Sequence, residues 1–176
     1  MWFDRTEADL ICAAQAGDRP AYADLLRPIY PTALRLACGL LQDADEAEDA
    51  VQEAAFTAWR RIRNLHEGSS LRPWFLGIVA NQCRAVKRNK WWSVSRPEPP
   101  EGAARETDLA SSIDVRRALR RIRHDERLIL VLRYYLDMPF DEVAATLGIS
   151  PKAARIRVER AIHRLKPMLR LQGAKV

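Results

Sequence analysis

Apolar residues recur at helical spacing along most of the chain, and no segment shows the strict alternation typical of a half-buried strand. The first predicted helix runs from Thr6 to Ala16. Asp18 is placed to cap a second helix, which extends to about Leu41 and contains Pro28 and Pro31. Because each proline removes a backbone N–H donor, the pattern predicts a kink or a break inside this helix.

A third helix is predicted from Asp43 to about Asn64, with an acidic beginning and an apolar stripe along one side. A short loop at residues 66–70 separates it from a fourth helix, predicted from Leu71 to about Lys90. Carboxylates near the start of a helix are favoured by the helix dipole alone. The acidic face of the third helix therefore has two interpretations: helix stabilisation, or a docking surface for a basic partner.

Residues 93–111 contain three prolines and a glycine and cannot sustain a helix through them. This segment is predicted to be an exposed, flexible linker. After it, helices are predicted at residues 112–123 and 125–136, followed by a helical pair within residues 139–165. The order of elements is four helices, a linker and four helices.

These elements predict an all-α fold class with two small helical domains. The first domain is assigned to residues 1–92 and the second to residues 112–176, with the linker at residues 93–111 between them. A chain of 176 residues has room for two domains of this size.

The stretch from Pro139 to Leu165 carries the strongest local signal. Its first helix has apolar residues at helical spacing and is followed by Gly148, which tolerates the positive φ of a short turn. Ser150 and Pro151 then give the N-cap and first-turn signature of a new helix. The pattern predicts a helix-turn-helix, the unit that places its second helix in the major groove of DNA.

The second helix of this unit has two distinct faces at about 100° per residue. The face predicted to pack inward consists of Ala154, Val158, Ala161, Ile162 and Leu165. The opposite face carries side chains that can reach base edges, namely Lys152, Arg155, Ile156, Glu159, Arg160 and His163. A charged face is usually only a solvated surface. The capped turn beside it is what favours DNA binding.

Charge is unevenly distributed along the chain. Residues 1–90 contain 12 Lys and Arg against 12 Asp and Glu, whereas residues 91–176 contain 17 against 11. The C-terminal half therefore carries the whole net charge of +6, as a polyanion-binding module would. No apolar run approaches the ~18 residues of a membrane helix, and the acidic, polar start does not resemble a secretory signal. No membrane insertion is expected.

The three cysteines and three histidines predict neither a metal site nor a cofactor. They are scattered along the chain without ligand spacing, and no CxxC pair occurs. Small, buried, reduced thiols are the simplest interpretation of the cysteines, and reduced thiols agree with a cytoplasmic protein.

The fourth helix carries a polar stripe beside its apolar one. Asn81, Arg84 and Arg88 stand at positions i, i+3 and i+7, with Lys87 adjacent, and two tryptophans follow at residues 91–92. Cations that follow phosphates and rings that stack on unpaired bases suit single-stranded nucleic acid. The alternative is that these cations are merely solvated.

Three segments resemble bacterial sigma factors of the extracytoplasmic-function group. They are DADEAEDAVQEAAFTAWRRI, LRPWFLGIVANQCRAVKR and LRYYLDMPFDEVAATLGISPKAARIRVERAIHRL. The resemblance implies a cytoplasmic transcription initiation factor that needs no cofactor and catalyses no reaction. The N-terminal domain would bind the clamp of core RNA polymerase and melt the minus-ten promoter element. The C-terminal domain would bind the polymerase flap and read minus-thirty-five DNA, and an anti-sigma factor is a further expected partner.

Roles follow by resemblance for positions that match the family's motifs. Polymerase binding is implied for Asp49, Gln52 and Glu53. Contact with melted minus-ten DNA is implied for Leu65, His66, Ser69, Ser70, Asn81, Arg84, Lys87 and Arg88. On the recognition helix, base contacts are implied for Arg155, Ile156, Glu159 and Arg160, and positions near phosphates for Lys152, Ala153 and Arg157.

Three positions on the recognition helix bear on DNA contact, and two of them, Ile156 and Glu159, suggest an unusual promoter sequence. Ala153 stands where the family usually has threonine, so one hydroxyl contact to phosphate is missing. Ile156 stands where the family usually has a small polar residue, and it could contact a thymine methyl group. Glu159 could accept a hydrogen bond from cytosine N4.

Two other classes of protein are less compatible with the sequence. A stand-alone helix-turn-helix regulator, which binds an operator without polymerase, would need a ligand pocket or an α/β receiver domain, and the N-terminal half shows no alternation of strands and helices. An enzyme that modifies nucleic acid would need a cluster of nucleophilic or metal-binding residues. The acidic third helix has carboxylates but no such residues converging on it.

Overall fold

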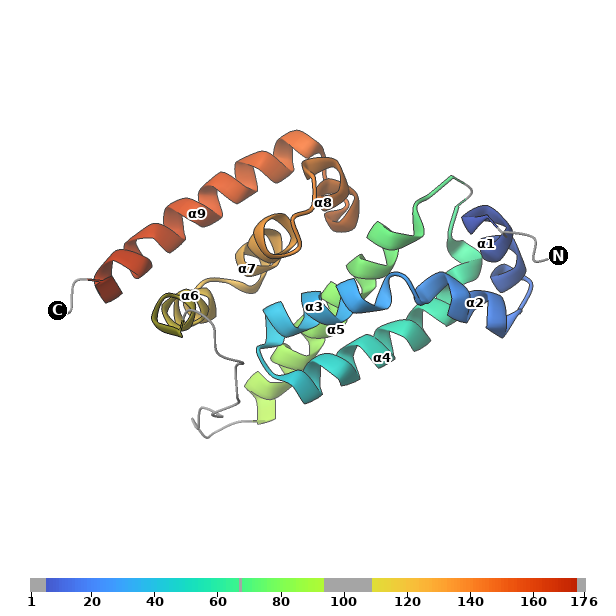
Figure 1. Cartoon of the computed structure of the whole chain (residues 1–176), viewed down its shortest axis with the longest axis horizontal. Coiled ribbons are helices and arrows are strands. Elements are labelled where there is room, and N and C mark those ends of the chain that lie inside the picture. Colours follow the sequence, from blue (N-terminus) through green and yellow to red (C-terminus); the bar gives the residue numbers. More distant parts are fainter. Residues whose placement is uncertain (1–5, 67, 94–108, 174–176) are drawn as a thin grey trace. The chain divides into compact units, whose positions relative to one another are not determined.

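The computed structural model describes residues 6–66, 68–93 and 109–173. Helices dominate these ranges and no strand occurs within them, which confirms the all-α prediction (Figure 1). The chain divides into two compact units, residues 1–87 and 88–176. None of the helices in the described ranges is both long and apolar enough to cross a membrane.

Within the described residues, the first unit contains five α-helices and one 3₁₀ turn, and the last helix continues past residue 87. They are α1 (Glu7–Gln15), α2 (Arg19–Leu26), α3 (Tyr30–Leu41), α4 (Ala44–Arg61), the 3₁₀ turn η1 (Ile62–Asn64) and α5 (Leu71–Ser93). Helix α1 packs against α2, and α3 packs against α4.

Three helices of this unit, α1, α2 and α4, begin with a side-chain cap. Thr6 and Asp9 form a reciprocal capping box at α1. The Asp18 carboxylate accepts from the Ala21 N–H (3.1 Å) at the start of α2. In the same way, Asp43 caps α4. Each cap satisfies a backbone donor that has no partner inside its helix.

The second predicted helix is broken rather than kinked. Helix α2 ends at Leu26 and α3 begins at Tyr30, with a turn closed by the Ile29 N–H on the Leu26 carbonyl (3.0 Å). Pro28 lies in the break, where it removes a donor. Pro31 lies in the first turn of α3, where the missing donor costs nothing. The expectation of four helices in this unit was therefore one too few.

Side chains from all of these helices make up the core of the first unit. The Tyr22 hydroxyl of α2 donates to the Ala55 carbonyl of α4 (2.6 Å), and its ring lies 5.0 Å from that of Trp59. The Gln82 Nε2 of α5 donates to the Thr57 hydroxyl of α4 (3.2 Å). These contacts tie α2 and α5 to α4.

The second unit contains four α-helices and one π-helical turn in the part of the chain that the structure describes. They are α6 (Leu109–Arg121), α7 (His124–Leu130), the π-helical turn η2 (Val131–Tyr135), α8 (Phe140–Leu147) and α9 (Pro151–Gly173). Helices α6, α7 and α8 all pack against α9.

A buried arginine joins the first two helices of this unit. The Arg127 Nε donates to the Leu119 carbonyl near the end of α6 (2.7 Å). A cation is favoured there because the C-terminal end of a helix carries partial negative charge. Burial, and then the nearby charge of Arg120, lower the pKa of Arg127 below its ordinary value.

Both edges of the predicted linker lie in helices. Residue 93 closes α5 and residues 109–111 open α6, so they are helical rather than linker. The three prolines and the glycine that predicted the linker fall within residues 94–108, outside the described residues. The limits of the two domains, residues 1–92 and 112–176, stay a prediction.

The three cysteines differ in exposure, which yields a chemical prediction. Cys12 is exposed, whereas Cys83 is buried, and burial raises the pKa of Cys83 to about 12. Because alkylation requires the thiolate, iodoacetamide at pH 8 should modify Cys12 readily and Cys83 only after unfolding in guanidinium. Peptide mass spectrometry of the native and unfolded protein measures both rates. Equal rates at the two cysteines in the native protein would contradict the burial of Cys83.

Candidate nucleic-acid interface

The turn between α8 and α9 has the geometry that the sequence predicted. Gly148 ends α8 in the left-handed region, with φ of 63° and ψ of 38°. The Ile149 N–H donates back to the Ala144 carbonyl (3.0 Å), which satisfies the end of α8. The Ser150 hydroxyl then accepts from the Ala153 N–H (3.2 Å), and Pro151 opens α9. The predicted helix-turn-helix is present.

The faces of α9 are also those predicted. Ala154, Val158 and Ala161 are buried against the neighbouring helices, while Ile162 and Leu165 are half-buried. Six of the seven predicted DNA-contacting residues on this helix are exposed, namely Lys152, Arg155, Ile156, Arg157, Glu159 and Arg160. The seventh, Ala153, is half-buried. Ile156 is 38% exposed, so a large apolar side chain stands in water on the predicted reading face.

The aromatic ring of Phe140, at the start of α8, makes cation–π contacts with two arginines. The guanidinium carbon Cζ of Arg155 lies 4.6 Å from the centre of the Phe140 ring, and that of Arg133 lies 5.1 Å from it. Cation–π contacts of this kind stabilise a pair by ~0.5–1 kcal/mol at exposed sites. Arg155 therefore does not point freely into solvent, because the Phe140 ring restricts its guanidinium.

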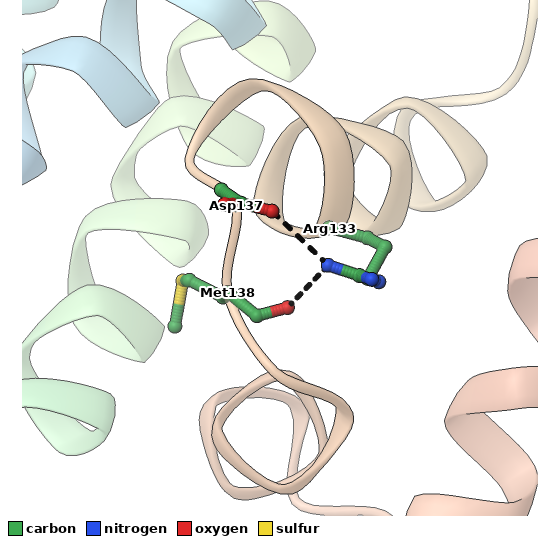
Figure 2. Close-up of polar contacts among 3 residues, drawn as sticks. All are labelled: Arg133, Asp137 and Met138. Atoms are coloured by element: carbon green, nitrogen blue, oxygen red, sulfur yellow. Dashed lines mark hydrogen bonds and ion pairs between the residues drawn. The ribbon is translucent and has the colours of Figure 1, made fainter.

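Figure 2 shows how the second arginine is fixed. The Arg133 Nη1 donates to the Met138 carbonyl (3.2 Å) and lies 3.4 Å from the Asp137 carboxylate. Asp137 adopts φ of 52°, a left-handed conformation that aspartate tolerates better than most residues. Since Asp137 is almost fully exposed, the ion pair adds little, and the bond to the buried turn at Met138 matters more.

Sequence reasoning missed Phe140 as a functional residue, because its spacing placed it with the apolar core of α8. It is half-buried, and the signal in the sequence was its position at the first residue of a helix, next to a proline.

Arg164, a cation in the second half of α9, forms an ion pair: its Nη1 lies 2.7 Å from the Glu126 carboxylate on α7.

The polar stripe on α5 is also as predicted. Asn81, Arg84 and Arg88 are exposed, and Lys87 is half-buried. Phe75, Val79 and Cys83 are buried on the other side of this helix. The side chains of the two tryptophans at residues 91–92 lie outside the described residues.

The loop before α5 presents three of its four predicted contacts to solvent. His66, Ser69 and Ser70 are exposed, and the Ser69 N–H donates to the His66 carbonyl (3.1 Å) in a turn. Leu65 differs, because its side chain is only 5% exposed and belongs to the core. In this structure, Leu65 supports the loop and does not present its side chain to a nucleic acid.

The acidic face of α4 is continuous with an exposed aromatic ring. Asp49, Gln52 and Glu53 are exposed as predicted. Phe56 follows on the same side of the helix and is 55% exposed, with the Arg60 Cζ 4.7 Å from its ring centre. The sequence signal was available, because Phe56 stands seven residues after Asp49, two helical turns along the polar stripe. Exposed aromatic residues are enriched in protein interfaces.

Among the described residues, no group of three or more histidine, cysteine or acidic side chains is arranged to hold a metal ion. The exposed residues described above carry cations, carboxylates, amides, hydroxyls and aromatic rings, together with the apolar Ile156. They are suited to bind nucleic acid and protein.

Family models match both units in order. Residues 25–93 match Sigma-70 region 2, and residues 112–165 match Sigma-70, region 4. The chain belongs to the sigma-70 family. The first match contains α4 and α5 with their stripes, and the second contains the helix-turn-helix, so the sigma factor carries each predicted contact face inside a matched region.

Relatives place this sigma factor in the extracytoplasmic-function group. It is 29% identical over 168 residues to the ECF RNA polymerase sigma factor SigM of Mycobacterium tuberculosis, covering 94% of this chain and 86% of SigM. It is 30% identical over 165 residues to the probable RNA polymerase sigma factor RfaY of Xanthomonas campestris, covering 84% of this chain and 40% of RfaY.

A solved structure has the same fold as this sigma factor. It is the sigma factor RpoE of Bartonella quintana, in complex with the anti-sigma factor NepR. The TM-score is 0.63 at 24% identity, covering 85% of this chain and 96% of RpoE.

The stack on Phe140 gives a prediction for DNA binding. Phe140→Leu keeps an apolar side chain but removes the ring, so duplex affinity should fall about two- to fivefold, the ratio expected from one exposed cation–π contact. Phe140→Tyr, which keeps the ring, should retain wild-type affinity. Fluorescence anisotropy measures the affinity of holoenzyme, assembled from core RNA polymerase and each variant, for a duplex carrying the recognised minus-thirty-five element, and circular dichroism checks the folding of each variant. Equal affinities of Phe140→Leu and the wild type would contradict a role for the ring.

Proposed function

We propose that the two units grip opposite ends of a promoter once core RNA polymerase holds them at the right spacing. The sigma factor is a transcription initiation factor that directs RNA polymerase to specific promoters. The observation that carries the proposal is that each matched region exposes its own cationic face, the α9 reading face in one and the α5 stripe in the other. Two weak sites on one chain gain effective concentration when their separation is fixed.

The α9 reading face is assigned to the minus-thirty-five duplex. Base contacts are proposed for Arg155, Ile156, Glu159 and Arg160. Phosphate contacts are proposed for Lys152 and Arg157, with the Ala153 backbone close to the same strand. Arginine and glutamate side chains reach base donors and acceptors in the major groove, and the exposed Ile156 is suited to a thymine methyl group.

The minus-ten element is assigned to the α5 stripe and the loop before it. We define the capture loop by its exposed residues His66, Ser69 and Ser70, which are proposed to receive an unpaired base. Asn81, Arg84, Lys87 and Arg88 are proposed to follow the same strand along α5. A stacked or pocketed base supplies ~1–3 kcal/mol, comparable to the cost of unpairing it, so DNA opening needs no chemical energy.

The exposed face of α4 is assigned to the polymerase clamp. Asp49, Gln52 and Glu53 supply charge and hydrogen bonds, and Phe56 supplies an apolar anchor beside them. Interfaces gain most of their energy from buried aromatic anchors surrounded by polar groups. The second unit is proposed to bind the polymerase flap while α9 reads DNA.

The remaining assignments follow from this mechanism. The sigma factor is proposed to catalyse no reaction, to need no cofactor, and to act in the cytoplasm with polymerase. An anti-sigma factor is a proposed partner, supported by the solved complex of RpoE with NepR. The alternative of a stand-alone operator-binding regulator is not favoured, because the N-terminal unit matches Sigma-70 region 2.

Transcription with purified components provides the first test of this function. Core RNA polymerase plus this chain should produce promoter-specific run-off transcripts from a random promoter library, and the chain alone should bind those promoters poorly. Asn81→Ala with Arg84→Ala should lose open complexes, detected by permanganate footprinting, yet keep polymerase binding. Asp49→Ala with Glu53→Ala is the matched control and should lose polymerase binding. Loss of polymerase binding in the α5 double variant would contradict the assignment of the stripe.

The promoter preference tests the proposed base reading. Removing the Glu159 carboxylate removes an acceptor for cytosine N4, so Glu159→Ala should reduce the preference for cytosine at one minus-thirty-five position by about tenfold. Sequencing of transcripts selected from the same library measures this change. His163→Ala, on the same exposed face but outside the proposed contacts, serves as the control. An unchanged preference in Glu159→Ala would remove this assignment.

A further inference from the structure

Both ends of the capture loop are tied to α1, a helix that precedes the part of the chain matched to Sigma-70 region 2. Helix α1 spans Glu7–Gln15, whereas the match begins at residue 25. No role was assigned to α1 from the sequence. Its side chains nevertheless reach residues more than forty positions away in the chain.

The first tie fixes the point where the chain leaves α4. The Gln15 Nε2 donates to the Ile62 carbonyl (3.1 Å) and to the Leu65 carbonyl (3.0 Å). The Ile62 carbonyl also accepts from the Leu65 N–H (3.0 Å), so the Gln15 amide adds a second bond to it and supplies a partner for the Leu65 carbonyl. Gln15 is half-buried, and the side chain of Leu65 is buried. The entry to the loop is therefore held through its backbone.

The second tie fixes the point where α5 begins. The Leu71 N–H donates to the Glu7 Oε1 (3.2 Å), and the Leu71 side chain is buried. A carboxylate is favoured at this place because the N-terminal end of α5 carries partial positive charge. It also occupies a backbone donor that would otherwise attract a DNA phosphate.

Helix α1 is itself held in place by a cap and by packing. The capping box of Thr6 and Asp9 fixes its start, next to Glu7. Ala14 is buried next to Gln15, and α1 packs against both α2 and η1. The side chains that hold the loop are therefore attached to a helix that is itself held by packing.

We infer that Gln15, together with Glu7, is a positioning residue for capture of the unpaired base, an inference that rests on the proposed role of the capture loop. The hydrogen bonds of the two residues go to backbone atoms on either side of the loop, so the proposed effect on DNA binding is indirect. By ordering the loop before DNA arrives, they reduce the conformational entropy lost on binding. Residues of α1, which precede the part of the chain matched to Sigma-70 region 2, therefore contribute to binding of the minus-ten element.

The test is a double-mutant cycle between the protein and the DNA. Holoenzyme is assembled from core polymerase and the full chain, and its affinity is measured for a fluorescent non-template strand of the minus-ten element found in the library. Single abasic sites are scanned along this strand with the wild-type protein to locate the captured base. Gln15→Met, which removes the two donors at similar size, is then compared on the intact strand and on the strand lacking that base.

The expected result is non-additive. Gln15→Met should bind the intact strand about tenfold more weakly than the wild type, because part of the stacking energy of one base is lost. It should bind the abasic strand within about twofold of the wild type. Gln82→Met is the matched control, because Gln82 also donates one hydrogen bond within the first unit but not to the loop. It should affect both strands equally or not at all.

Two other results would overturn the inference. If Gln15→Met weakens both strands to the same degree, or neither, Gln15 does not act through the captured base. If the wild-type scan finds no position where base removal matters, base capture by this loop is itself wrong, and that failure is seen before any variant is made.

A second pair of variants tests the positioning role independently, in case Gln15→Met does not fold. Glu7→Gln keeps an oxygen that accepts from the Leu71 N–H and should behave as wild type, whereas Glu7→Leu should show the same strand-dependent loss. Thermal unfolding followed by circular dichroism reports the stability of each variant. Equal strand affinities of Glu7→Gln and Glu7→Leu would exclude Glu7 from the positioning role.

Discussion

Small side chains at the helix contacts are the constraint on which the rest of this structure depends. Ala33 and Ala37 of α3 and Ala47, Ala54 and Ala58 of α4 are all fully buried where these helices pack. Alanine lets two helices approach closely, since the distance between axes is set by the side chains at the contact. Long polar side chains are thereby left to the outside of each helix. A larger residue at any of these positions would cost about 1–3 kcal/mol through overpacking.

The same constraint operates in the helix-turn-helix. Ala154, Val158 and Ala161 bring α9 against its neighbours, so that Arg155, Glu159 and other long side chains of α9 face outward. The side of α9 that is buried therefore determines which side chains form the exposed reading face. The cation–π contact with the Phe140 ring further restricts the orientation of the Arg155 guanidinium.

Local signals in the sequence were sufficient to predict the helix starts, the turn at Gly148 and the two faces of α9. They were sufficient because a cap or a turn is determined by residues within a few positions of each other. The bonds of Gln15 to the Leu65 carbonyl and of Glu7 to the Leu71 N–H were not predictable, since no periodicity links residues so far apart. The break near Pro28 was foreseen only as one of two outcomes.

Candidate site residues followed the same division. The exposed stripe on α5 and the acidic face of α4 could be placed from helical spacing, and their assignment to DNA and polymerase came from the resemblance to sigma factors. Burial of Leu65 and exposure of Phe56 needed the packed structure. Three large aromatic rings, Phe56, Tyr134 and Tyr135, stand more than half exposed in the described part of the chain. Water solvates such rings poorly. A partner that covers one of these rings removes apolar surface from water, so the free energy gained on binding rises with the area that it covers.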